Sequence, residues 1–185
     1  MRDLPVVQLV VSANADIHAV PERGVIRTPL QAAVETGAWD IINFLLGRGV
    51  DVNAPPAINN GRTALQIAAE KGFIGIASLL ISKKADVNAP PGQFHGRTAF
   101  EAAAEHGRIE MLIYLVENGA DIVSDGGRQY KNALRFAKMN GHTGVDIYVK
   151  DVYRTQCFLR SGMNTTPLEN GQSSESYEFD PRLFL

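Results

Sequence analysis

Residues 63–97 read TALQIAAEKGFIGIASLLISKKADVNAPPGQFHGR, and this stretch of 35 residues recurs along the chain. A chain built from copies of one unit predicts a repeat architecture, in which each unit packs mainly on its neighbours. The recurrence is marked by the aspartates Asp16, Asp51, Asp86 and Asp121, and by the columns Thr28/Thr63/Thr98, Leu30/Leu65/Phe100, Ala33/Ala68/Ala103, Gly37/Gly72/Gly107 and Leu45/Leu80/Leu115.

Each unit predicts a pair of helices. Thr63 and Gln66 have the spacing of a capping box, in which each side chain satisfies a backbone N–H at a helix start. Gly72 suits the left-handed position that ends a helix. Ile76 and Leu80 then follow at helical spacing and predict a second helix. The same roles fall to Thr28 with Gln31, Thr98 with Glu101, Gly37, Gly107 and Gly141, and to the second-helix sets Ile41/Phe44/Leu45, Met111/Tyr114/Leu115 and, more weakly, Val145/Tyr148/Val149.

The second helix is followed by an extended segment. Asp-Val-Asn-Ala-Pro-Pro occupies residues 51–56 and again 86–91, and the paired prolines exclude helix there. The residues up to the next Thr form a long turn, or finger. Lys84 stands where Gly49 and Gly119 stand in other units, so it must adopt a left-handed conformation. The recurring aspartate is a candidate turn acceptor.

These columns resemble the ankyrin repeat, whose pattern runs from a Thr-Pro-Leu helix start through Ala-Ala and Gly to a Leu-Leu pair and a Gly-Ala-Asp-Val-Asn ending. The resemblance covers roughly residues 6–149. It implies an all-α fold, an ankyrin-repeat solenoid of stacked helix hairpins with extended fingers. The chain departs from the family in its spacing of 35 residues against about 33, and in having Gln31, Gln66 and Glu101 where the family has histidine. The Ala-Pro-Pro fingers are similar to those of filamentous-fungal ankyrin proteins.

The copies predict four regions. Residues 1–23 form a leading half-unit, because 6–11 align with a second helix, and this half-unit is either a cap or part of a longer array. Residues 24–127 hold three full units. Residues 128–153 form a degraded capping unit, whose first helix is expected to begin at Asn132. Residues 154–185 predict a flexible tail, in which the apolar residues 177–185 are either frayed or a short docking segment.

Composition limits the classes of partner. Eighteen basic against twenty acidic residues give a net charge of −2, which offers no electrostatic footprint for direct nucleic-acid binding. The single cysteine, Cys157, excludes an internal disulfide and predicts a reducing compartment. The apolar residues 4–11 are too few to span a membrane. We therefore expect an intracellular protein, in cytoplasm or nucleus, that is monomeric unless its N-terminal half-unit pairs.

Motifs of catalysis are absent from the sequence. It contains no GxGxxG after a strand, no Walker loop, no HExxH and no GxSxG. The histidines occupy different positions of the repeat and do not converge. We expect no catalytic residue, no metal site and no cofactor. The four histidines are His18, His95, His106 and His142.

The resemblance to ankyrin repeats implies a concave binding surface made by the fingers and the first helices. A cationic ladder precedes the helix starts, and an acidic ladder follows eight residues later. The two ladders are either available to a partner or paired with each other between neighbouring units. The cations are Arg27, Arg62, Arg97 and Lys131, and the acids are Glu35, Glu70 and Glu105.

The finger tips differ between units, and variable residues on a constant frame are where specificity can reside. Phe94 and Tyr130 are candidate anchors, since aromatic residues dominate binding hot spots. The alternative is that each ring packs against a neighbouring finger. The tips are residues 22–25, 57–60, 92–95 and 128–130, and the candidate binding residues are Asn59, Asn60, Arg62, Gln93, Phe94, His95, Arg97, Tyr130 and Lys131.

The sequence thus predicts a non-catalytic adaptor or scaffold that binds a protein of unknown identity. Two more specific roles stay open by resemblance: a transcription coregulator of a fungal biosynthetic gene cluster, and the C-terminal array of a larger receptor-like protein. An unrecognised enzyme is the remaining alternative, and a deep pocket with convergent polar groups would favour it.

Overall fold

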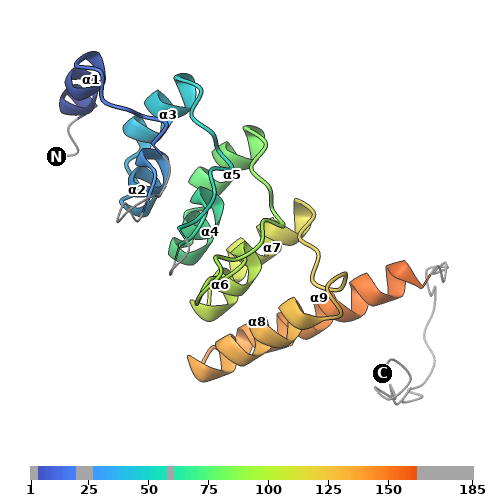
Figure 1. Cartoon of the computed structure of the whole chain (residues 1–185). Helices are drawn as coiled ribbons and strands as arrows, with labels where there is room; N and C mark the ends of the chain where they lie inside the picture. The colour runs from blue at the N-terminus through green and yellow to red at the C-terminus, as the bar shows by residue number, and fades with distance from the viewer. Residues whose placement is uncertain (1–3, 20–26, 58–60, 162–185) are drawn as a thin grey trace, which may run out of the picture.

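The computed structural model describes residues 4–19, 27–57 and 61–161. Within these ranges the chain forms helices and no strand, with one bridged residue at Phe94. Figure 1 shows the first helices of successive units stacked in one row and the second helices in another. The helices are α1 (Leu4–Ser12), α2 (Pro29–Glu35), α3 (Trp39–Gly47), α4 (Ala64–Lys71), α5 (Ile74–Ser82), α6 (Ala99–Glu105), α7 (Ile109–Glu117), α8 (Arg128–Met139) and α9 (Thr143–Arg160). The all-α solenoid of helix hairpins is confirmed.

Capping boxes start the first helices of the three full units, as predicted. In α4, the Thr63 hydroxyl accepts the Gln66 N–H at 3.3 Å, while Gln66 Oε1 accepts the Thr63 N–H at 2.9 Å. The same reciprocal pair begins α2 and α6. Because each box satisfies two backbone donors that a helix start leaves unpaired, it fixes where the helix begins.

Left-handed residues end the helices where the sequence predicted them. Gly72 has φ +73°, and a Cβ added there would lie 3.0 Å from Cδ of Arg108. Both its backbone conformation and its close approach to the next unit therefore require glycine. Lys84 adopts φ +71° despite its side chain, which costs about 1–2 kcal/mol.

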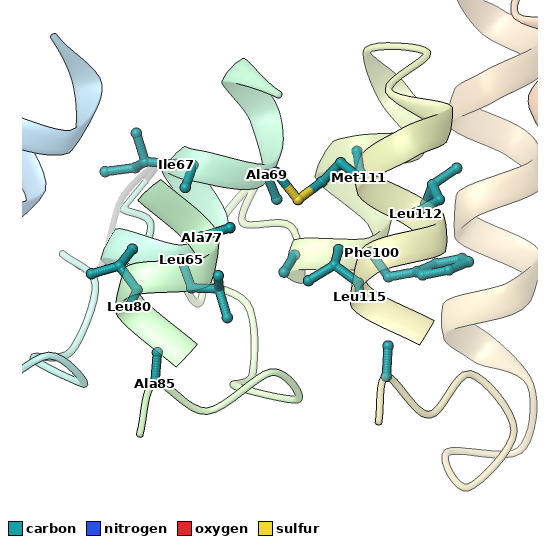
Figure 2. Packing of buried hydrophobic residues seen from close by; sticks show 14 of the residues in the cluster. Leu65, Ile67, Ala69, Ala77, Leu80, Ala85, Phe100, Met111, Leu112 and Leu115 are labelled. Atoms are coloured by element: carbon teal, nitrogen blue, oxygen red, sulfur yellow. The ribbon is translucent and has the colours of Figure 1, made fainter. Parts of the chain in front are cut away.

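The core runs through all units and is made by the predicted columns. Leu65, Phe100 and Leu80 are each no more than 1% exposed. Figure 2 shows Leu65 and Leu80 on the two helices of one hairpin, and Phe100 pointing toward the helices of the last unit. The prediction missed a further column in the second helices, since Ile42, Ala77 and Leu112 are fully buried next to the predicted anchors.

The loops after the second helices join one unit to the next. Asp51 Oδ1 accepts the Asn53 N–H at 2.8 Å, which confirms the aspartate as a turn acceptor. The Asn53 side chain then donates to Lys84 O at 2.9 Å and accepts the Asp86 N–H at 2.8 Å. Asn88 repeats both bonds toward Gly119 and Asp121. Each asparagine thereby satisfies the backbone of the following loop.

The leading half-unit is a single helix, α1, with no buried residue. It packs beside α3 and leaves an apolar stripe open to solvent. Val6, Leu9 and Val10 are 53%, 68% and 48% exposed. Within the described residues, the half-unit therefore exposes part of its apolar face.

The last unit begins earlier than predicted. We expected a helix start at Asn132 and a finger tip at residues 128–130, whereas α8 begins at Arg128. Gly127, at φ +73°, precedes the helix, and Asp125 Oδ2 accepts the Gln129 N–H at 2.9 Å. The acidic side chain satisfies a first-turn N–H in place of a capping box. Tyr130 therefore lies within a helix and not at a finger tip, and Lys131 lies within the helix and not just before its start.

The last helix ends later than predicted. Residues 154–160 were assigned to a flexible tail, but α9 continues through Arg160. Gln156 explains the extension, because its Oε1 accepts the Ile122 N–H at 3.0 Å and its Nε2 donates to Ala120 O at 2.7 Å. Val123 stands where Asn53 and Asn88 stand in the earlier loops. The glutamine of α9 thus satisfies loop backbone groups in the unit that lacks this asparagine.

Candidate protein-binding surface

The fingers are tight loops closed by glycine. A Cβ on Gly96 would lie 2.2 Å from the Gly92 nitrogen, and one on Gly61 would lie 2.1 Å from the Ala57 oxygen. Any side chain at these two positions would collide with its own loop. Gly92 in turn lies against the preceding finger, because a Cβ added to Gly92 would lie 2.7 Å from the backbone oxygen of Gly61. Neighbouring fingers therefore contact each other through backbone atoms.

The tip of the third finger, residues 92–95, presents its side chains to solvent. Gln93, Phe94 and His95 are all exposed, with Phe94 at 51%. His95 has φ +56°, so the tip turns sharply on a non-glycine residue. The candidate residues Asn59 and Asn60, at the tip of the preceding finger, lie outside the residues that the structure describes.

The cationic and acidic ladders pair with each other, each arginine with the glutamate eight residues later. Arg27 lies 2.7 Å from Glu35, Arg62 lies 2.9 Å from Glu70, and Arg97 lies 2.9 Å from Glu105. Of the two alternatives stated for the ladders, pairing with each other is the one observed. Each first helix is short enough for the arginine just before its start to reach the glutamate at its end. Because each guanidinium group is already paired with a carboxylate, it has fewer free N–H donors and less net charge for a partner than an unpaired arginine would have.

Arg97 has the most contacts of these arginines. Its Nη1 donates to His95 O at 3.2 Å and to Gly96 O at 3.0 Å, so it holds the finger next to the tip. Its guanidinium carbon also lies 3.8 Å from the centre of the Phe136 ring in α8, a cation–π contact. The geometry makes Arg97 a residue that positions the finger.

Tyr130 packs on another ring. Its ring centre lies 3.9 Å from that of Tyr153 in α9, at an interplanar angle of 17°. Burial raises the pKa of the Tyr153 hydroxyl, and the side chains of Cys157 and Tyr130 raise it further. Lys131, the next residue of α8, is exposed. The Tyr130 ring is thus packed inside the protein. The alternative stated for the candidate anchors was packing against a neighbouring finger, and here the ring packs against helix α9 instead.

Two side chains that the sequence assigned only to capping also position the fingers, and the third capping residue, Glu101, has a different partner. The Gln31 amide donates to Ala54 O at 3.1 Å, and the Gln66 amide donates to Ala89 O at 3.1 Å and to Pro90 O at 3.0 Å. Glu101 cannot donate. Instead its Oε1 accepts from the Asn132 amide at 2.8 Å. The change from glutamine to glutamate in this column is the sequence signal for the change of partner.

One apolar pit lies at the opposite ends of the helices, near the turns between α2 and α3 and between α4 and α5. It has a volume of about 340 Å³ and is lined by Thr36, Gly37, Trp39, Phe73, Gly75 and Ile76. No titratable side chain lines it, so it lacks the convergent polar groups that favour an enzyme. Within the described residues, no group of three or more His, Cys, Asp or Glu side chains could hold a metal ion.

None of the helices in the described part of the chain has the length and apolar character needed to cross a membrane. The carboxyl of Asp121 has a shifted pKa. Burial raises its pKa, but hydrogen bonds from Val123 and Ser124 and the charge of Arg160 outweigh burial, and the pKa lies below its ordinary value.

Comparison with known families agrees with this geometry. The family model described as ankyrin repeats (3 copies) matches residues 2–91 and 55–126, which together span more than half of the chain. A search of curated proteins finds no matching relative. The family is generally non-catalytic, and its repeats typically bind proteins. With its capping boxes, left-handed helix ends and stacked hairpins matching that model, the chain belongs to the ankyrin-repeat family.

Proposed function

We propose that this protein is a non-catalytic adaptor or scaffold that binds a protein partner through its fingers, with Phe94 as the apolar anchor. The observation that carries the proposal is the exposure of Phe94, 51%, at the tip of a loop whose neighbouring residues are held in place. An exposed aromatic ring on a fixed loop loses little conformational entropy on binding, which is the property that makes aromatic residues binding hot spots.

The finger is held in place from two directions. Gly96 allows the loop to close on itself, and Arg97 donates to the carbonyl oxygens of His95 and Gly96. Arg97 is anchored in turn by Glu105 and by the Phe136 ring. The loop can therefore present Phe94 in one orientation before the partner arrives.

The remaining candidate residues have a supporting role in this proposal. Gln93 and His95 flank the anchor and supply polar contacts at its rim, and the same role is assigned to Asn59 and Asn60 on the preceding finger. Arg62 and Lys131 add positive charge to the same surface. Tyr130 ranks below Phe94, because its ring is already stacked on Tyr153.

The proposal assigns the protein to the interior of the cell, in cytoplasm or nucleus, as the single cysteine led us to expect. It requires no cofactor and no chemical step. The more specific roles of coregulator and receptor array have no observation in the described residues that favours one over the other, and the adaptor function covers both.

The test compares two single variants in affinity purification from the native cell, followed by mass spectrometry. Phe94→Ala should remove the partner while the melting temperature stays within about 1–2 °C of the parent, because a finger tip adds little to the core. Ile147→Ala is the matched control, since Ile147 is an exposed apolar side chain, at 73%, on α9. Retention of the partner by Phe94→Ala, or its equal loss from both variants, would refute Phe94 as the anchor.

A further inference from the structure

A basic face runs along α8. It consists of Arg128, Lys131, Arg135 and Lys138, and all four side chains are exposed. Their spacing of three, four and three residues places them on one side of the helix. The buried residues Ala133, Phe136 and Ala137 lie on the other side. Helix α8 contains no acidic residue, so its solvent-facing side carries charge of one sign.

The basic face of α8 is equivalent to the face that first helices of the inner units pack against the following unit. Arg135 and Lys138 align with Glu101 and Ala104 of α6, which are 4% and 0% exposed. In the described part of the chain no further first helix follows α8, which lies with α9 at the opposite end of the stack from α1 (Figure 1). Within the described residues, the four side chains of the basic face are therefore exposed at a position that is covered in the inner units.

The charges on this face are largely unpaired. Among the described residues, Lys131, Arg135 and Lys138 form no ion pair, and Arg128 only approaches Asp125 at 3.6 Å with a side chain that is 75% exposed. By contrast, the arginines before α2, α4 and α6 each lie within 2.9 Å of a glutamate. The basic face thus retains charge that a partner can neutralise.

The arrangement is unfavourable for the isolated helix. Like charges three and four residues apart repel each other, and Arg128 and Lys131 lie in the first turn, at the positive end of the helix dipole. A capping helix that served solubility alone would mix charges of both signs. A face of one sign that costs helix stability indicates an anionic partner that offsets the repulsion.

We propose that the basic face of α8 docks an acidic segment of a protein. The face is about 15 Å long, from a rise of 1.5 Å per residue, and matches about three turns of an acidic helix or about five extended residues. A protein is favoured over a nucleic acid because the aromatic rings of α8 are not free for stacking on bases. Tyr130 is stacked on Tyr153, and Phe136 is 6% exposed beneath Arg97.

This inference rests on the proposed function, in that it gives the chemistry of one part of the partner. It uses residues outside the finger, so the two can fail separately. The Phe94→Ala variant tests the finger, and charge changes at Arg135 and Lys138 test the basic face.

The experiment measures fluorescence anisotropy of a labelled peptide of about 12 residues, rich in Glu and Asp, with the full chain at about 50 mM and about 300 mM salt. The parent should bind at low salt and weaken at high salt. The double variant Arg135→Glu/Lys138→Glu should lose about tenfold or more in affinity, because it reverses two charges on the docking face. The neutral double variant Arg135→Gln/Lys138→Gln should have an affinity between those of the parent and the charge-reversed variant. It replaces the charge-reversed variant in the test if that variant does not fold.

Arg48→Glu/Lys83→Glu is a closely matched control. Both residues are exposed, the change in net charge is the same, and Arg48 lies 4.8 Å from the Phe44 ring as Arg135 lies 4.8 Å from the Phe136 ring. This control should stay within about twofold of the parent. Equal losses from the two reversed pairs would overturn the site, since they would show a response to net charge alone.

Two further results would overturn the proposal. One is absence of peptide binding by the parent at low salt. The other is tighter binding of a mixed-sequence single-stranded DNA through Arg135 and Lys138, which would assign the face to nucleic acid. In purification from the native cell, loss of the partner with Phe94→Ala but not with the α8 pair would leave the finger proposal intact and overturn the assignment of the basic face to this partner.

Discussion

The side-chain amide of Gln66 donates to the backbone oxygen of Ala89 at 3.1 Å, although 23 residues separate them. The same side chain closes the capping box of α4 by accepting the Thr63 N–H. One glutamine therefore fixes both the start of its own helix and the position of the finger that follows the second helix of the same unit. The bond depends on an amide, because only an amide can accept on one side and donate on the other.

Gln66→Glu should destabilise the protein by about 1–3 kcal/mol, because a carboxylate would face the carbonyl oxygens of Ala89 and Pro90 without a proton to donate. Glu101→Gln is the reciprocal control and should cost less than about 0.5 kcal/mol, since the Asn132 amide can turn to accept from the new glutamine. Urea denaturation followed by circular dichroism measures both. Similar stabilities for the two variants would contradict the assigned bonds.

Leu80→Ala should cost about 2–5 kcal/mol, because Leu80 is fully buried and its loss leaves a cavity. Leu9→Ala removes a leucine that is 68% exposed and should cost less than about 0.5 kcal/mol. The same urea titration applies. A surface-like loss at Leu80 would show that the core is misassigned.

Gln156→Ala should leave the Ile122 N–H and the Ala120 oxygen without their side-chain partner and cost about 1–2 kcal/mol. Amide hydrogen exchange is the more specific measurement, since the Ile122 N–H should exchange faster while the Asp121 N–H, bonded to Asn88, is preserved. Unchanged exchange at Ile122 would refute the role of Gln156 as a cap on this loop.

Acid should remove the contribution of Asp121 to stability. Its folded-state pKa lies below the ordinary value of 3.8, so the ionised carboxyl stabilises the fold above about pH 4, and this contribution is lost as the pH falls through the folded-state pKa. Asp121→Asn should be less stable than the parent at about pH 6 and should approach it at about pH 3. A constant difference in melting temperature over this range would contradict the assignment.

The local structure of the full units could be read from the sequence because its causes are local. A capping box joins residues three apart, as in Thr63 and Gln66, and a left-handed helix end depends on one glycine such as Gly72. The second-helix anchors were found by a spacing of three and four residues. The degraded unit broke these rules, since neither the early start of α8 nor the late end of α9 has a motif of this kind.

The candidate site was harder to predict. The exposure of Phe94 agreed with its assignment to a finger tip, whereas Tyr130 was placed in a finger and lies in a helix. The pairing of Arg97 with Glu105, and its contact with Phe136, depend on a register between helices that sequence spacing does not contain. Whether a side chain is available to a partner is decided by such contacts.

From its sequence alone, this chain is determined to be a stack of ankyrin hairpins, because repeated local signals start and end each helix and a repeated apolar pattern fills the core. Only the tertiary structure decided which polar groups join segments that are distant in the sequence, as in Gln66 with Ala89 and Gln156 with Ala120. Those partners lie 23 and 36 residues apart in the sequence, and they meet because the stacking of the helices brings these distant segments side by side. The same stacking leaves the basic side of α8 uncovered at one end.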